Sequence, residues 1–171
     1  MSDDARCEGE IEGLPFGEQF LLWTLRQWVA AYKEEDGAGH DALRTGFDLA
    51  GIADGYLAAD ELLTIVAHSA TGSIDVRCAR CPDISPDEQI FIGLIAALQR
   101  AEFAAARVML SFWLAPAGVR RAQAPAGRLV RLMALGGLTL RPRRITGDGA
   151  APTPAGDWPP VGDRPAVPTV H

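Results

Sequence analysis

The stretch SPDEQIFIGLIAALQ (residues 85–99) decides the fold of this chain. Ser85 suits the position before a helix, Pro86 suits its first position, and Glu88 stands three residues after the serine. In such a capping box the serine oxygen accepts a backbone N–H of the first turn, and the glutamate accepts the serine N–H. A helix is predicted over about 86–100, and apolar residues nearly all round it predict a central position among other helices. They are Ile90, Phe91, Ile92, Leu94, Ile95 and Leu98.

Five further segments have apolar residues at helical spacing and are predicted to surround this central helix. They span about 16–33, 41–50, 58–70, 102–114 and 120–135. In the first, the polar residues Glu18, Arg26 and Lys33 are assigned to the side away from the apolar face. Pro116 is expected to stop the fifth of the six helices, and a break near Pro125 in the sixth is left open.

The chain is predicted to be an all-α, single-domain bundle of about six helices. Its 171 residues are 48% hydrophobic and 22% charged, which is typical of one soluble globular domain. Residues 1–13 are predicted to be a flexible acidic N-terminus, and residues 14–144 the helical domain. Within it, residues 74–76 are interpreted as a short strand or an extended connector. Residues 145–171 are rich in Pro, Gly and Ala without apolar periodicity, which predicts a disordered tail.

The N-terminus and the cysteine content favour a cytoplasmic location. A signal peptide would begin with basic residues and an apolar run, whereas the first residues here are acidic. The three cysteines do not make a disulfide framework, and an odd number fits poorly with an oxidising compartment. The longest apolar run, residues 90–98, has roughly half the length that crosses a bilayer, so no membrane span is expected.

Cys78 and Cys81 form a CxxC pair within the stretch RCARCPDISPDE. Two thiolates at this spacing can hold one zinc ion, but a structural zinc site takes two further ligands. The other residues of suitable chemistry are His68, Cys7 and His40. Zinc binding is therefore an alternative in which Cys78, Cys81 and His68 are the candidate metal ligands.

The same pair admits a redox interpretation, because an extended segment, the two cysteines, Pro82 and a helix follow one another. A helix N-terminus lowers the pKa of a neighbouring thiol through its dipole. Ser85 places the helix start several residues after Cys81, beyond the short range of that effect. The preferred interpretation is a structural turn that leads into the helix, with one or both cysteines partly buried.

One further stretch resembles a metal site, and the common catalytic motifs are absent from the sequence. Residues 54–61 match the second half of a calcium-binding EF-hand loop, but Ala50 and Ile52 occupy the first and third ligand positions, so a simple turn is expected. No GxSxG, HExxH or glycine-rich phosphate-binding motif occurs, and therefore no catalytic and no cofactor-binding residue is predicted.

The charge of the chain is unevenly distributed around a net value of −6. Residues 118–144 contain seven arginines and no acidic residue, whereas residues 1–63 contain fourteen acidic residues and four basic ones. Such an arginine-rich segment can neutralise phosphates, but no nucleic-acid-binding fold motif accompanies it. Nucleic-acid binding is therefore not expected, and pairing with the acidic half of the chain explains the arginines equally well.

The order of features resembles that of a group of small uncharacterised bacterial helical proteins. The resemblance covers about 16–142: a GEQFLLWTLRQWVA helix, a middle helix pair, a cysteine-containing turn, the SPDEQIFIGLIAALQ helix and an alanine-rich pair ending in LTLRPR. It implies an all-helical fold and brings no activity or site residue. The expected function is a cytoplasmic protein-interaction or regulatory module without catalytic activity, acting on an unknown protein partner. The alternative is a small zinc- or nucleic-acid-binding regulator that uses the CxxC pair or the arginine-rich region.

Overall fold

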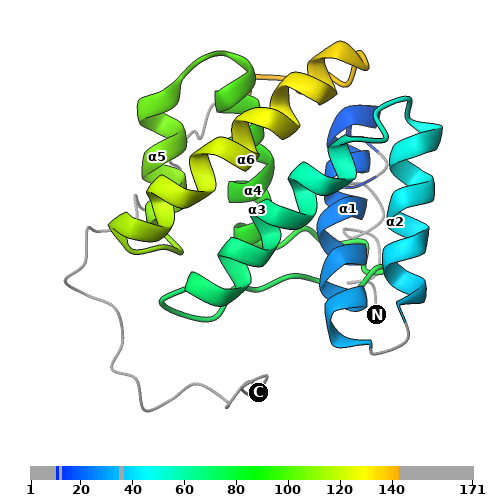
Figure 1. Cartoon of the computed structure of the whole chain (residues 1–171), viewed down its shortest axis with the longest axis horizontal. Coiled ribbons are helices and arrows are strands. Elements are labelled where there is room, and N and C mark those ends of the chain that lie inside the picture. The colour runs from blue at the N-terminus through cyan, green and yellow to red at the C-terminus, as the bar shows by residue number, and fades with distance from the viewer. Residues whose placement is uncertain (1–10, 12, 35–36, 143–171) are drawn as a thin grey trace, which may run out of the picture.

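The computed structural model describes residues 11, 13–34 and 37–142, and these residues form six helices (Figure 1). The helices are α1 Phe16–Lys33, α2 Ala38–Leu49, α3 Gly55–Ser69, α4 Pro86–Gln99, α5 Phe103–Ser111 and α6 Pro116–Leu135. The predicted all-α bundle is therefore confirmed. The described residues contain no β-strand, so residues 74–76 are an extended connector. The predicted tail at 145–171 lies outside the described residues, as do all but two residues of the predicted flexible N-terminus.

α4 lies at the centre of the bundle, as its apolar residues predicted. Ile92, Leu94 and Ile95 have no exposed surface, and the helix packs against α1, α5 and α6. In Figure 1 it runs behind α6, with α5 on one side and α1 on the other. The predicted capping box is present: Ser85 Oγ accepts the Glu88 N–H at 3.1 Å, and the Glu88 carboxylate accepts the Ser85 N–H at 2.8 Å.

Four of the other five helices form two close pairs, and α5 packs chiefly against α4. α3 and α6 run antiparallel, because Gly118 near the start of α6 faces Ser69 at the end of α3. α1 and α2 lie side by side (Figure 1). A Cβ atom at Gly39 would lie only 2.5 Å from the Cβ of Ala31, so this glycine permits the close approach of α2 to α1. None of the helices in the described ranges combines the length and apolar character needed to cross a membrane.

Several helix ends differ from those predicted. α2 and α3 begin earlier than predicted, at Ala38 and Gly55, and α5 ends earlier, at Ser111. Pro116 does not stop α5; it occupies the first turn of α6, where a missing N–H leaves no hydrogen bond unmade. Pro125 lies inside α6 and does not break it. Pro125 is buried on the packed side of α6, so the apolar surface that its ring buries offsets part of the cost of the lost backbone bond.

The assignment of Glu18 and Arg26 to the polar side of α1 was wrong. These residues are 1% and 4% exposed, and Leu22, which lies between them on the same face of the helix, is 2% exposed. Irregular segments cover this face at both ends. The Arg141 N–H donates to Glu18 Oε1 at 3.2 Å, and Arg26 contacts the connection between α3 and α4. Backbone groups outside helices need hydrogen-bond partners when buried, and the charged side chains supply them.

Candidate functional site

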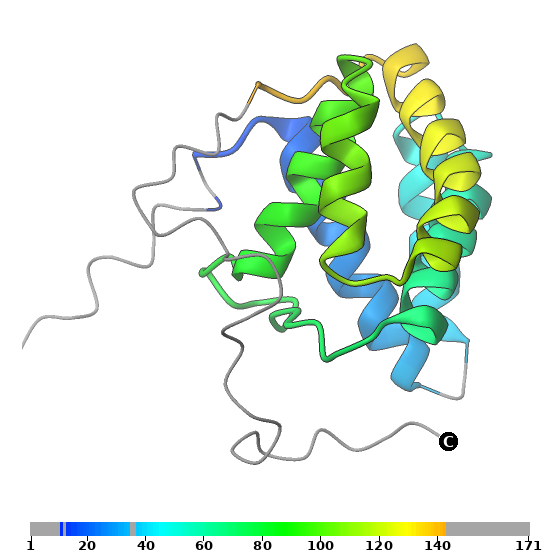
Figure 2. The same ribbon diagram turned by 90° about the vertical axis from the view of Figure 1, so that its left-hand side faces the viewer.

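The connection between α3 and α4, residues 70–85, is the most unusual part of the described fold, and we call it the cysteine loop. It contains neither helix nor strand and is longer than most connections in compact domains, few of which exceed about 12–15 residues. Figure 2 shows it running along one end of the bundle. Four consecutive residues at its tip, 77–80, are all exposed and include Cys78. Long ordered loops of this kind often carry function.

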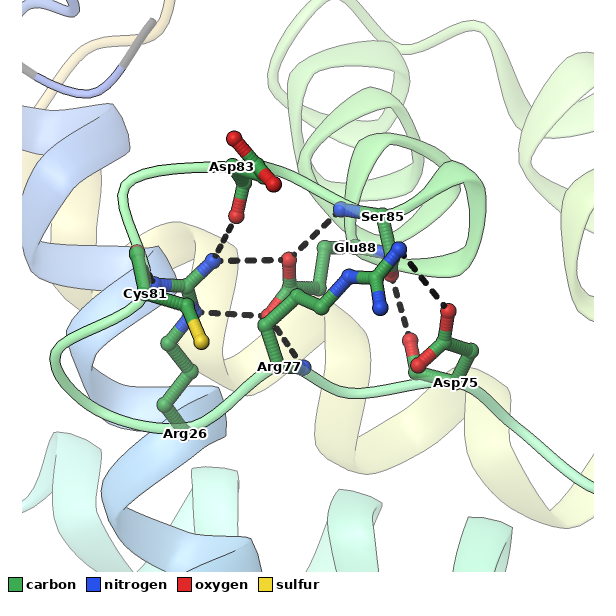
Figure 3. Close-up of polar contacts among 7 residues, drawn as sticks. All are labelled: Arg26, Asp75, Arg77, Cys81, Asp83, Ser85 and Glu88. Carbon is green, nitrogen blue, oxygen red and sulfur yellow. Dashed lines mark hydrogen bonds and ion pairs between the residues drawn. The ribbon is translucent and has the colours of Figure 1, made fainter. Parts of the chain in front are cut away.

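A buried ion pair lies directly beneath the cysteine loop (Figure 3). Arg26 of α1 donates from Nε to Glu88 Oε1 at 2.7 Å and from Nη2 to Glu88 Oε2 at 2.9 Å. The side chains are 3% and 0% exposed. The two-pronged geometry suits the planar guanidinium, and the glutamate raises the pKa of Arg26 further above its ordinary value, mainly through this hydrogen bond.

The ion pair uses its remaining hydrogen-bonding capacity on the backbone of the cysteine loop. Arg26 donates to the carbonyl oxygens of Cys81 and Asp83, each at 2.6 Å. Glu88 accepts the N–H of Arg77 at 3.0 Å, in addition to the N–H of Ser85. Buried charges are expensive unless such bonds satisfy them, and here the loop backbone provides the bonds. The loop and the ion pair therefore stabilise each other.

Further bonds fix the loop at its two ends. Asp87 in the first turn of α4 accepts the backbone N–H of Asp75 at 2.7 Å and the indole N–H of Trp113 at 2.8 Å. The Ser85 hydroxyl donates to the Asp75 carbonyl oxygen, and the Thr71 N–H donates to the Trp113 carbonyl oxygen at 2.8 Å. The tip is thus an exposed segment on a rigid base.

Cys78 and Cys81 lie together at this tip. The Cys81 N–H donates to the Cys78 carbonyl oxygen at 3.1 Å and closes a tight turn, which keeps the two residues close. Cys78 is exposed and Cys81 is partly buried. A hydrogen bond between the two thiols lowers the pKa of Cys78 and raises that of Cys81. The N–H of Arg80 also lowers the pKa of Cys78, and the charge of Arg26 adds to this effect.

The third candidate metal ligand, His68, is engaged elsewhere. Its Nε2 lies 3.1 Å from the hydroxyl of Tyr32, and His40 makes a similar contact at 3.2 Å with the hydroxyl of Tyr56. Among the described residues, no three His, Cys, Asp or Glu side chains are arranged so that they could hold one metal ion. Cys7 lies outside the described residues, and zinc binding by the CxxC pair stays a prediction.

Two of the three carboxylates in the EF-hand-like stretch contact different partners. Asp60 accepts the indole N–H of Trp28 at 2.7 Å, and Glu61 forms an ion pair with Arg128 of α6. That ion pair joins the acidic and the basic half of the chain. Such pairing was one of the two explanations offered for the arginine-rich segment. The arginines that α6 contributes to this region are all exposed: Arg120, Arg121, Arg128 and Arg131.

A shallow hollow of about 440 Å³ between α1, α2 and α3 is the other candidate site. Its polar side chains already contact one another. Tyr56 bonds to His40, and the guanidinium of Arg44 lies 4.8 Å from the centre of the Tyr56 ring and 2.8 Å from Asp41. Since these groups satisfy each other, the hollow gives less indication of a ligand than the cysteine loop does.

Comparison with protein-family models, curated proteins and solved structures finds no match for this chain. The resemblance to small bacterial helical proteins therefore stays a prediction. The site residue that sequence reasoning missed is Arg26. The available signal was its position four residues after Leu22, on the face of α1 that also carries Glu18, although the partner could not be identified from that spacing.

Proposed function

We propose that this protein is a non-catalytic protein-interaction or regulatory module and that the cysteine loop is its recognition element. The observation that carries this proposal is the use of the buried Arg26–Glu88 pair to hold the loop backbone. A loop already ordered before binding loses less conformational entropy when a partner binds. This arrangement supports presentation of one fixed shape, the exposed segment 77–80, to a partner.

The chemistry of the tip favours a partner with an acidic surface. Arg77 and Arg80 flank Cys78 and are exposed, so they can pair with carboxylates of another protein. Arg77 would then exchange its exposed 3.6 Å ion pair with Asp75 of the same loop for the new one. The odd cysteine count supports a cytoplasmic setting. A regulator that binds nucleic acid through α6 is less well supported, because Arg128 already pairs with Glu61.

Site-specific photo-crosslinking in the source cell tests this proposal. A photoreactive residue replaces Ala79 at the tip or, as the matched control, the exposed Gln123 on α6. We expect a protein that crosslinks from position 79 and not from 123. The purified partner should bind the purified chain, and Arg77→Ala with Arg80→Ala should weaken binding by about tenfold or more, equivalent to about 1.4 kcal/mol. Equal crosslinking from both positions, or unchanged binding by the arginine variant, would refute the role of the loop.

A further inference from the structure

We propose that Cys78 and Cys81 form a reversible intramolecular disulfide, which makes the cysteine loop a thiol–disulfide switch. The dithiol chemistry follows from the turn itself, whereas its effect on partner binding rests on the function proposed above. No part of that function requires the two cysteines to react with each other.

The geometry of the turn supports ring closure. A hydrogen-bonded turn from residue i to i+3 holds its end Cα atoms within about 7 Å, and disulfides span Cα separations of about 4.4–6.8 Å. The turn bond between Cys81 and Cys78 meets this condition, and the side-chain interaction with Cys81 is the largest cause of the lowered pKa of Cys78. The bond can therefore form with little movement of the backbone.

The base of the loop favours the same reaction. Arg26 donates to the Cys81 carbonyl oxygen at 2.6 Å, which fixes the backbone of the less exposed cysteine. The backbone N–H groups of Arg80 and Cys81 also lower the pKa of Cys78, which favours its thiolate. Thiolate stabilisation here comes from the turn and from Arg26, so it does not require the helix dipole that lies too far along the chain.

The reaction is an exchange with a small-molecule disulfide such as oxidised glutathione. The Cys78 thiolate attacks one sulfur of that disulfide, forms a mixed disulfide and releases one thiolate. Cys81 then loses its proton, and its sulfur attacks Cys78, breaks the mixed bond and releases the second thiolate. The protein dithiol is oxidised by two electrons, and the small disulfide is reduced to two thiols.

Oxidation changes the charge and the hydrogen bonding of the tip. The disulfide has no ionisable thiol between Arg77 and Arg80, and the Cys81 S–H donor disappears. Because the tip is exposed, a bound partner would contact this altered surface directly. The switch is therefore expected to alter affinity through the tip, while the Arg26–Glu88 base stays in place.

The test equilibrates the folded full chain with mixtures of reduced and oxidised glutathione, followed by acid quenching, alkylation and mass spectrometry. Cys7→Ser removes the third cysteine, and in this chain we expect molecules with either two free thiols or a 78–81 disulfide at intermediate mixtures. Further substitution Cys81→Ser should instead trap a glutathione adduct on Cys78. The Cys7→Ser chain that carries Cys78→Ser instead of Cys81→Ser should form the glutathione adduct much more slowly, because the exposed attacking thiol is absent.

Stable glutathione adducts on the Cys7→Ser chain, or disulfide-linked dimers in place of the 78–81 bond, would overturn the switch. Circular dichroism checks that each variant remains helical. Binding of the crosslinked partner to the reduced and the oxidised chain gives a separate result. A 78–81 disulfide in a chain that has no partner at the cysteine loop would support the dithiol chemistry and refute the proposed function. A partner that binds the loop of a chain that forms no such disulfide would support the proposed function and refute the switch.

Discussion

Replacing Glu88 by alanine should severely destabilise the protein. The substitution leaves Arg26 as a charged side chain that is 3% exposed and has lost both bonds to its carboxylate partner. Removing one member of a buried ion pair typically costs about 3–5 kcal/mol, because the other charge stays buried without compensation. The N–H groups of Arg77 and Ser85 lose their acceptor as well. We expect a loss of about 4 kcal/mol in the free energy of unfolding, a large share of the roughly 5–15 kcal/mol that stabilises a domain.

Urea unfolding at pH 7, followed by circular dichroism, measures this loss. The matched control is Glu102→Ala, because Glu102 also holds an arginine with two bonds, at 2.8 and 2.9 Å to Arg100, but is exposed. Solvent screening should leave that variant close to the wild type. If the alanine variant does not fold, Glu88→Gln replaces it in this measurement. Glutamine keeps the length of the side chain, so we expect a smaller loss in the free energy of unfolding.

A double-mutant cycle tests whether the two charges act on each other directly. Arg26→Met combined with Glu88→Ala should cost less than the sum of the single losses by about 1–3 kcal/mol, because no charge then remains buried. The reasoning is refuted if the Glu88 variant loses no more than the Glu102 control, or if the two losses simply add.

Three further predictions concern the turns, the helix contacts and the reactive thiol. Ala101 lies just after the C-cap of α4 with φ +59°, so Ala101→Gly should stabilise the protein by up to about 1 kcal/mol. Gly137→Ala at φ +73° should cost about as much, and equal signs of the two changes in urea unfolding would contradict this. Gly39→Ala should destabilise the protein by about 1–3 kcal/mol, because the added methyl group would collide with α1. Gly127 has open space around it, so Gly127→Ala should stabilise the protein by about 0.5–1 kcal/mol. Similar melting temperatures for the two variants would show that α2 can shift freely. The pKa of Cys78 is lowered chiefly by the side chain of Cys81, so Cys78 should be alkylated rapidly at pH values where an ordinary thiol is protonated and unreactive. A midpoint of the pH–rate curve at or above that of a free cysteine would disprove the lowered pKa.

The central helix shows how far sequence patterns can predict this structure. The capping box at Ser85 and Glu88 involves residues three positions apart, so its geometry is local and the predicted start of α4 is confirmed. The starts without a side-chain cap had mixed outcomes. α1 and α5 begin within one residue of the predicted positions, whereas α2, α3 and α6 begin earlier than their apolar patterns indicated. Periodicity alone fixes a helix start only loosely where no side chain marks the first turn.

The candidate site was only partly predictable for the same reason. The CxxC spacing identified Cys78 and Cys81, and the structure shows the predicted turn between them, with Cys81 partly buried. Nothing local identified the support beneath them. Arg26 is far from Glu88 along the chain, and its pattern on α1 was taken as solvent-facing.

By itself, the sequence determined the all-α class, the central position of α4 and the presence of a cysteine turn before that helix. These features depend on residue spacing within one element and on the amount of apolar surface to be buried. Tertiary structure decided which charged residues are buried and where their bonds are directed. The partners of Arg26 and Glu88 include backbone groups of an irregular loop, and such groups carry no side-chain signature. They become acceptable partners for a buried charge only when packing brings α1, α4 and the cysteine loop together.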